Sequence, residues 1–284
     1  MSKIIDGQIL AEKIKSNIAQ EIIKLNARPN LAILLVGERA DSELYVSLKE
    51  KEAKKVGIDT HLYKCEKNIS ELEILKIIKY LNKDELIDAI LVQLPLPDNL
   101  NTDIIIKAID PLKDVDGFHP DNLRILMDDC EHNKAMPPIF AVIFEMLKSI
   151  KCDLAGKNVA VIANSKIFGN SLTRALDCHG AKTTLCHYGD KKLINKISVA
   201  DILITAVGKK NFIKKNMVKQ DAVVIDIGIT RQNGKVFGDV DFDDVKNKTS
   251  FIAPVPGGVG PMTIAMAFKN TLALYKKRRN QGIK

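Results

Sequence analysis

Short apolar runs alternate with helical patterns along the chain, and this alternation constrains the fold more than any other feature of the sequence. Five runs rich in Val, Ile or Leu are bounded by turn residues, as buried strands of a parallel sheet are. They cover residues 31–36, 89–94, 158–162, 201–206 and 222–227. Segments between them carry apolar residues at helical spacing, for example residues 7–25. Repeated strand–helix–strand units predict an α/β fold.

Several helix ends and one domain boundary are also marked. Ser70 with Glu73 forms a capping box before a helix over residues 71–82. Ser42 is predicted to cap a helix that ends at Gly57. A polar stretch ends in two prolines at 137–138, and a second α/β unit follows. We therefore expect a boundary near residues 135–140.

Composition excludes several classes of protein. No apolar run approaches the ~20 residues of a membrane helix, and the N-terminus has no signal-peptide core, so we predict a cytoplasmic protein without membrane contact. Net charge is +8, but the one dense basic run, residues 276–279, is expected to be a solvated tail. Tryptophan is absent and aromatics are only 5%, which disfavours nucleic acid as a partner. The five scattered cysteines form no CxxC pair, so we predict reduced thiols and no metal site.

Candidate catalytic residues follow two of the predicted strands. Tyr45 and Lys49 are four residues apart on a helix that opens after the strand 31–36, so they share one helix face. A partly desolvated lysine there can lose its proton near neutral pH and act in acid–base chemistry. The alternative is a solvated lysine on a charged helix. Gln93 ends the strand 89–94 before two prolines, either as a rigid polar group or as a simple strand terminator.

Two loops offer binding groups. Asp116 and Gly117 lie in a turn, where a buried aspartate can accept paired N–H bonds from a heterocycle; His119 nearby is expected to be structural. Residues 254–263 are dense in Gly and Pro, which favours a stiff loop whose backbone N–H groups approach a ligand.

A phosphate loop is predicted between the strand 158–162 and a helix from about residue 170. It comprises Ala163-Asn164-Ser165-Lys166-Ile167-Phe168-Gly169. Only Gly169 matches the usual glycine-rich fingerprint of a dinucleotide site. Residues 226–228, at the end of a later strand, are expected to border the same crevice.

Together these segments closely resemble the bifunctional methylenetetrahydrofolate dehydrogenase/methenyltetrahydrofolate cyclohydrolase family. The resemblance spans almost the whole chain and is most specific at residues 92–97, 113–119 and 254–263. It implies a catalytic α/β domain of residues 1–138, completed by a C-terminal helix at 262–284. It also implies a Rossmann-like NAD(P)-binding domain at 139–261, a folate cleft between the two domains, and a homodimer.

The resemblance also implies residue roles. Lys49 matches the catalytic lysine, Tyr45 the ring-stacking tyrosine, Gln93 the glutamine that holds the lysine, and Asp116 the pterin-binding aspartate. The substrate, a tetrahydrofolate, is expected to contact these residues and Gly117, Pro256, Gly257 and Gly258. NADP, with NAD as the alternative, is expected to contact Ala163, Asn164, Ser165, Gly169 and Ile229. The implied reactions oxidise 5,10-methylenetetrahydrofolate to the methenyl compound and hydrolyse that to 10-formyltetrahydrofolate.

The nucleotide half departs from the family pattern. Asn164 replaces an arginine that can meet a 2′-phosphate, and Ser171 replaces a proline. Ala163 replaces a glycine, and its methyl group would crowd a phosphate if its φ were positive. Two alternatives therefore stay open: a monofunctional cyclohydrolase with impaired dinucleotide binding, and a non-catalytic folate-binding partner.

Overall fold

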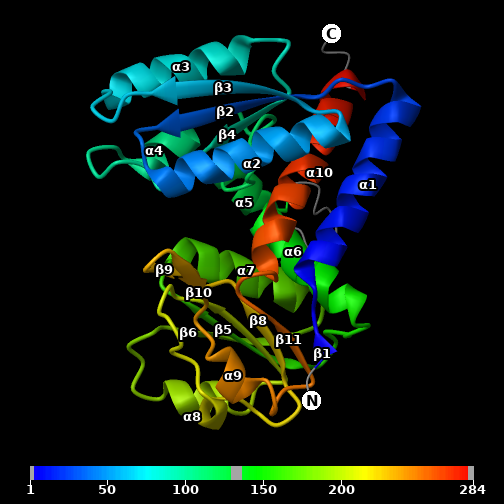
Figure 1. Ribbon diagram of the computed structural model, residues 1–284, viewed down its shortest axis with the longest axis vertical. Coiled ribbons are helices and arrows are strands. Elements are labelled where there is room, and N and C mark those ends of the chain that lie inside the picture. Colours follow the sequence, from blue (N-terminus) through cyan, green and yellow to red (C-terminus); the bar gives the residue numbers. More distant parts are fainter. Residues whose placement is uncertain (1–2, 129–135, 281–284) are drawn as a thin grey trace. The chain divides into compact units, whose positions relative to one another are not determined.

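The computed structural model describes residues 3–128 and 136–280, and the chain folds into two compact units (Figure 1). Of these residues, the first unit holds 3–11, 125–128 and 139–263, and the second holds 12–124, 136–138 and 264–280. Two short segments from the first half of the chain, residues 3–11 and 125–128, thus belong to the first unit. Strand β1 (Lys3–Ile4) belongs to the first unit because it pairs in parallel with β11 (Phe251–Ala253).

The second unit is built on a three-stranded parallel sheet in the order β3-β2-β4. Its strands are β2 (Asn30–Val36), β3 (Asp59–Cys65) and β4 (Ala89–Val92). The helices that lie wholly or largely in this unit are α1 (Gly7–Leu25), α2 (Ala40–Val56), α3 (Glu71–Lys83), α4 (Thr102–Lys107), α5 (Pro120–Asp128) and α10 (Val259–Asn280). In Figure 1, α2 and α3 lie on opposite faces of this sheet.

Strand β2 is apolar from Leu31 to Val36 because both of its faces are covered there. Leu31, Ile33 and Leu35 pack in one core with residues of α1, α2 and α10. Their neighbours Ala32, Leu34 and Val36 pack in a second core with residues of α3 and α4. Side chains alternate between the faces of a strand, so a doubly covered strand has no polar face. The centre of this sheet is therefore a rigid platform for the residues that follow its strands.

The first unit is built on a six-stranded parallel sheet in the order β1-β11-β8-β7-β5-β6. The remaining strands of this sheet are β5 (Asn158–Ala163), β6 (Lys182–Cys186), β7 (Ile202–Ala206) and β8 (Val223–Asp226). The helices of this unit are α6 (Pro138–Ser149), α7 (Lys166–Cys178), α8 (Leu193–Ile197) and α9 (Phe242–Val245), with a 3-10 turn η1 (Lys215–Met217). A separate hairpin joins β9 (Thr230–Gln232) to β10 (Lys235–Phe237). Strand order reverses between β5 and β7, and ligands bind at such switch points.

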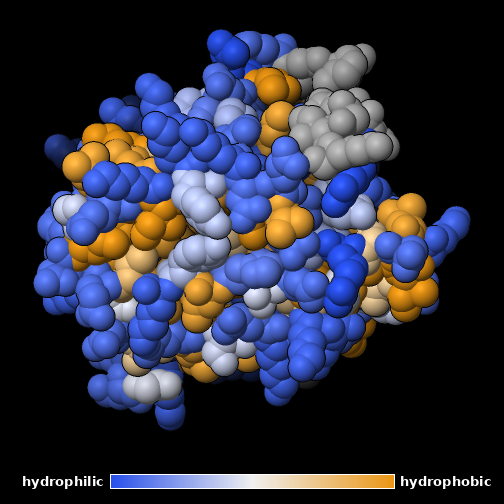
Figure 2. All heavy atoms as spheres, turned by 90° about the horizontal axis from the view of Figure 1, so that it is seen from above, coloured by the Kyte–Doolittle hydropathy of each residue, from blue (hydrophilic) through white to orange (hydrophobic). Residues whose placement is uncertain are grey.

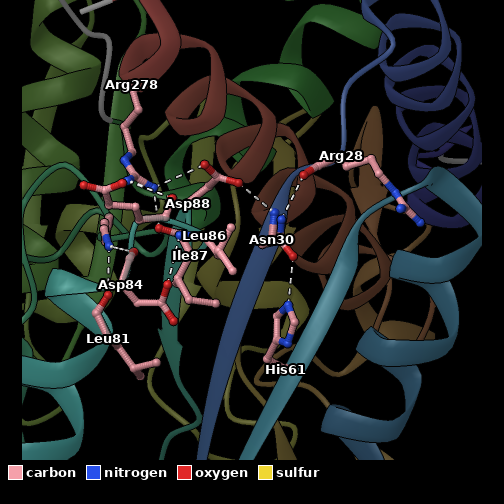
Figure 3. A network of polar contacts seen from close by, with 11 residues as sticks. Arg28, Asn30, His61, Leu81, Asp84, Leu86, Ile87, Asp88 and Arg278 are labelled. Atoms are coloured by element: carbon pink, nitrogen blue, oxygen red, sulfur yellow. Dashed lines mark hydrogen bonds and ion pairs between the residues drawn. The ribbon is translucent and has the colours of Figure 1, made fainter. Parts of the chain in front are cut away.

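A buried polar network fixes the end of α10 in the second unit (Figure 3). Arg278 donates to the backbone oxygens of Ile87 and Glu85 and pairs with the Asp88 carboxylate at 3.2 Å. Asp88 also accepts the backbone N–H of Asn30, at the start of β2, at 2.8 Å. Both charged side chains are buried, so their partners replace water. The expectation of a solvated basic tail is therefore wrong at Arg278.

Most predicted elements are confirmed, and the errors have local causes. The five predicted strands are β2, β4, β5, β7 and β8, and the Ser70–Glu73 capping box is present. Ser42 is not a cap: α2 begins at Ala40, which leaves Ser42 buried inside its first turn. Strands β3 and β6 escaped prediction because they lie at sheet edges and carry many polar residues.

Two further observations concern cysteines and the surface. Cys65, Cys152 and Cys186 are free, but Cys178 is disulfide-bonded, so the prediction of reduced thiols is wrong there. A disulfide depends on proximity in the fold, which the spacing of single cysteines does not reveal.

Hydrophilic residues cover most of the face in Figure 2, with apolar residues in separate groups. In the part of the chain that the structure describes, no helix is both long and apolar enough to span a membrane.

Candidate active site and dinucleotide site

Lys49 and Gln93 meet at the carboxyl edge of the three-stranded sheet. Lys49 lies on α2, which follows β2, and its Nζ donates to Gln93 Oε1 at 2.7 Å. Gln93 comes directly after β4, and its backbone N–H donates to Leu34 of β2 at 2.9 Å. Its Nε2 donates to the Leu94 carbonyl at 2.7 Å, which fixes which end of the amide faces the lysine. Lys49 therefore has a defined polar partner, which a lysine solvated on a charged helix would not have, and Gln93 both follows the end of β4 and holds this lysine.

Asp116 reaches the same edge because residues 113–115 run parallel to β4. Ile90 donates to the Lys113 carbonyl at 2.7 Å and forms a parallel bridge with Asp114. Two residues further along this register, Asp116 lies beside the carboxyl end of β4. The Asp114 carboxylate accepts the backbone N–H groups of Gly117 at 3.0 Å and His119 at 2.8 Å, which closes the turn around Asp116.

Desolvation tunes both charged groups of this site. Burial lowers the pKa of Lys49, and the nearby Asp116 carboxylate opposes that shift. Burial raises the pKa of Asp116 to about 6, and the positive charge of Lys49 opposes that shift. A lysine with a lowered pKa holds a larger neutral fraction near pH 7, which is what a general base requires.

The other residues of this unit that the sequence analysis singled out are Tyr45, Gly117 and His119. Tyr45 is partly exposed and lies one helical turn before Lys49 on α2. Gly117 has a φ of +68°, which favours glycine. His119 is buried; its Nδ1 accepts the backbone N–H of Asp121, and its Nε2 lies 3.2 Å from the Lys107 carbonyl. The structural interpretation of His119 is confirmed.

The predicted phosphate loop, residues 163–169, lies at the carboxyl edge of the six-stranded sheet, where the strand order reverses. Ala163 is the last residue of β5, and its φ is not positive. The condition under which its methyl group was expected to crowd a phosphate is therefore not met. Ser165 caps α7, its hydroxyl accepting from Phe168 N–H at 3.2 Å. The helix begins at Lys166, not near residue 170 as predicted. A helix N-terminus at this edge suits a phosphate.

Asn164, Gly169 and Ile229 lie around this loop. Asn164 Nδ2 donates to the Val207 carbonyl at 3.0 Å, across the β5–β7 switch point. Gly169 allows α7 to pack closely on β6, because an added Cβ would lie 2.7 Å from Leu185 Cδ1. Ile229 follows β8 and is exposed. Gly208, next to Val207, has a φ of +71°, and a Cβ there would meet only the Ile229 carbonyl, at 4.0 Å, so this part of the loop is loosely packed.

The loop after β11 also belongs to the first unit. Gly257 accepts the backbone N–H of Gly7 at 3.0 Å, and Gly258 donates to the Pro254 carbonyl at 2.8 Å. The peptide bond before Pro256 is cis. These contacts hold Pro256, Gly257 and Gly258 in a tight turn, as the Gly- and Pro-rich sequence predicts.

One buried residue of the first unit was missed by sequence reasoning. Asp239 is fully buried behind the loops that follow β7 and β8, and its carboxylate accepts three hydrogen bonds from residues 205–209. The sequence around it is polar and short, with no periodic pattern that would mark it.

The fold defines a two-unit α/β protein in which one unit is of the Rossmann type and the other brings Lys49, Gln93 and Asp116 to one sheet edge. Two family models match the chain. The tetrahydrofolate dehydrogenase/cyclohydrolase catalytic domain matches residues 5–116, and the NAD(P)-binding domain of the same family matches residues 137–279.

Similar proteins agree over nearly the full length. The bifunctional protein FolD of Sulfurihydrogenibium sp. (strain YO3AOP1) is 46% identical, over 97% of this chain and 98% of that protein. The crystal structure of FolD from Campylobacter jejuni has a TM-score of 0.93 at 39% identity, over 98% of this chain and 100% of that one. The Trypanosoma brucei FolD structure, complexed with NADP cofactor and inhibitor, has a TM-score of 0.93 at 29% identity, over 98% of each chain.

The chain belongs to the tetrahydrofolate dehydrogenase/cyclohydrolase family. The predicted two-domain α/β fold is confirmed, and so is the predicted class of enzyme, an oxidoreductase and hydrolase of one-carbon folate metabolism.

Proposed function

We propose that this enzyme oxidises 5,10-methylenetetrahydrofolate with NADP and hydrolyses the methenyl product to 10-formyltetrahydrofolate, with Lys49 as the acid–base group. The observation that supports this assignment most is the hydrogen bond from Lys49 Nζ to Gln93 Oε1, near Asp116, whose pKa the positive charge of Lys49 lowers. NADP is proposed because the Trypanosoma brucei relative is complexed with it.

In the dehydrogenase step, a hydride leaves the methylene carbon of the folate. The nicotinamide, when bound, supplies the hydride acceptor. The protein contributes orientation: Tyr45 stacks on the flat folate ring, and Asp116 accepts N–H bonds from the pterin. The loop 163–165 and the start of α7 would hold the phosphates of the dinucleotide.

In the cyclohydrolase step, water adds to the methenyl carbon. Neutral Lys49 takes the proton that this water loses, which leaves a hydroxyl group on a tetrahedral carbon. The bond from that carbon to N5 then breaks while Lys49 returns its proton to N5, and loss of the hydroxyl proton to solvent yields the 10-formyl group. Gln93 keeps the lysine amine oriented toward the reacting carbon through both transfers.

Replacing Asp116 by alanine is expected to weaken folate binding. The substitution removes a charge-assisted contact of about 1.5–3 kcal/mol, which corresponds to a Kd about 10–150 times higher. The Kd for a tetrahydrofolate is measured by fluorescence titration, with Asp98→Asn, an exposed carboxylate of the same unit, as the control. An unchanged Kd in Asp116→Ala would remove this residue from the site.

Folate affinity is also expected to depend on pH through Asp116. Its raised pKa, about 6, means that the carboxylate is charged above pH 6 and becomes neutral below it. The charge-assisted contact is therefore present at pH 7–8 and is lost as the pH falls through 6, with Kd rising up to about tenfold per pH unit. Kd is measured between pH 5 and 8. The Asp116→Ala variant is the control, because its Kd reports only the titration of the folate itself. The same dependence of Kd on pH in this variant and in the wild type would refute the role of Asp116.

One assay tests the proposed function as a whole. Purified protein is given methylenetetrahydrofolate with NADP or NAD, and the methenyl product is followed by absorbance. Turnover with either cofactor supports the bifunctional enzyme, and the ratio of rates gives the preference that Asn164 affects. Methenyl hydrolysis without any oxidation would instead identify a monofunctional cyclohydrolase. Absence of both activities beside folate binding would identify a non-catalytic partner.

A homodimer stays a prediction that rests on the family resemblance, and a cytoplasmic location stays a prediction that rests on the sequence of the N-terminus and the lack of long apolar runs. Sedimentation equilibrium of the purified protein tests the first, since a dimer has twice the mass of the 31.5 kDa chain. A monomer at micromolar concentration would contradict it.

A further inference from the structure

Two buried carboxylates lie behind the loops at the carboxyl edge of the six-stranded sheet. Asp226 is the last residue of β8 and is 2% exposed, and Asp239 follows β10 and is 0% exposed. Buried carboxylates cost stability unless hydrogen bonds replace their water, so their partners are informative.

Asp226 holds the backbone around Asp239. Its Oδ1 accepts the N–H groups of Gly228 at 2.9 Å and of Asp239 at 3.1 Å. Its Oδ2 accepts the N–H of Val240 at 2.9 Å. Burial raises the pKa of Asp226 to about 7, and the negative charge of Asp239 adds to this increase. The end of β8 is thereby tied to the segment that carries the second carboxylate.

Asp239 in turn holds the loop that follows β7. Its Oδ2 accepts the Thr205 hydroxyl at 2.8 Å and the N–H of Val207 at 2.7 Å, and its Oδ1 accepts the N–H of Lys209 at 2.8 Å. The carbonyl of the same Val207 accepts Asn164 Nδ2 at 3.0 Å. A continuous chain of hydrogen bonds therefore runs from the end of β8, through the β7 loop, to the phosphate loop after β5.

The packing around the two carboxylates leaves no room for adjustment. A Cβ on Gly228 would lie 2.0 Å from Asp239 Cγ, and a Cβ on Gly238 would lie 2.0 Å from Asp226 Oδ2. Because neither glycine has a side chain, the backbone at each lies directly against a carboxylate. The position of each carboxylate therefore determines the position of the loop backbone beside it.

We propose that Asp226 and Asp239, together with Thr205, are positioning residues that set the shape of the dinucleotide crevice without touching the cofactor. This inference rests on the proposed function, because the loops after β5, β7 and β8 are taken to line the crevice. It predicts that dinucleotide affinity depends on a carboxylate behind the crevice, whereas methenyl hydrolysis, which depends on Lys49, does not.

The test measures NADP binding to the free protein by calorimetry and, separately, cyclohydrolase kcat and folate KM. Asp239→Asn replaces one acceptor oxygen by an NH₂ group, which cannot accept a hydrogen bond. It is expected to raise the Kd for NADP at least about tenfold, with cyclohydrolase kcat and folate KM within about twofold of wild type. Thr205→Val, which removes one hydroxyl donor, is expected to raise the Kd for NADP about fivefold. Thr205→Ser keeps the hydroxyl and is expected to have the wild-type Kd.

Asp241→Asn is the matched control. Asp241 lies two residues after Asp239, pairs with Lys214 at 2.6 Å and caps α9. Its replacement by asparagine is expected to leave the Kd for NADP unchanged. Wild-type Kd in folded Asp239→Asn, or in Thr205→Val if Asp239→Asn does not fold, would overturn the inference. A fall in cyclohydrolase kcat that parallels the loss of NADP affinity would also overturn it, since the role would then be general stability. Wild-type protein that binds neither NADP nor NAD would instead overturn the proposed dehydrogenase function.

Discussion

Lys49→Ala is expected to lower the kcat of methenyl hydrolysis by about 10²–10⁴-fold, the usual contribution of a general acid–base group. Lys49 has a lowered pKa because of burial, and Gln93 fixes its amine by a 2.7 Å hydrogen bond. Alanine removes the amine that moves the proton from water to N5. Loss of the Lys49 charge also removes an effect that lowers the pKa of Asp116, so the Kd for folate is compared at pH 8, where that carboxylate is expected to stay charged and the Kd to change little.

Two companion variants separate proton transfer from charge. Lys51→Ala, an exposed lysine two residues further along α2, is expected to keep wild-type kcat. Lys49→Arg keeps a positive charge but cannot lose its proton near neutral pH, so its kcat is expected to fall with that of Lys49→Ala. The measurement is the disappearance of methenyltetrahydrofolate absorbance. Wild-type hydrolysis by Lys49→Ala would refute the assignment of this lysine.

Arg278→Ala is expected to lower the free energy of unfolding by about 3–5 kcal/mol, the range for breaking a buried ion pair by removing one partner. Arg278 and Asp88 are both buried, and the Asp88 carboxylate would keep its burial without its cation. The pKa of Asp88 is already raised by burial, an effect that Arg278 and the Asn30 N–H oppose. The carbonyl oxygens of Ile87 and Glu85 would also lose a donor.

Urea denaturation followed by circular dichroism measures this effect. Lys277→Ala, the exposed neighbour on α10, is expected to change the unfolding free energy by less than about 0.5 kcal/mol. Arg278→Lys keeps the charge but loses the forked geometry, so an intermediate loss is expected. A loss below about 1 kcal/mol in Arg278→Ala would mean that the network in Figure 3 does not anchor the helix.

The parts of the fold that could be predicted are those in which burial leaves a mark on the sequence. Strand β2 is buried on both faces and is therefore apolar at every inner position, and the capping box at Ser70 has a fixed spacing. Strand β3 pairs only with β2 and keeps polar residues such as His61, so its pattern is ambiguous. Ser42 has the residue type of a cap but lies two residues inside the helix, where position alone decides its role.

The candidate site was predictable where chemistry requires a particular residue type. Lys49, Gln93 and Asp116 each follow a strand or a turn, and the structure places all three at one sheet edge. Asp239 and Asp226 were harder to predict as a pair, because all of their partners except the Thr205 hydroxyl are backbone N–H groups, which any residue type can supply. A residue that binds backbone leaves no complementary side chain to find, and only the folded structure reveals the contact.

Helices α1 and α10 each divide between the two units, the first at residues 11–12 and the second at residues 263–264. A gene cut near codon 138 would therefore yield no intact module. The upstream piece would lack Phe268, Leu272 and Arg278, which complete its core and its anchor, and the downstream piece would lack β1, the edge strand beside β11. Fission at that point would therefore not separate oxidation from hydrolysis, because neither piece would keep a complete unit.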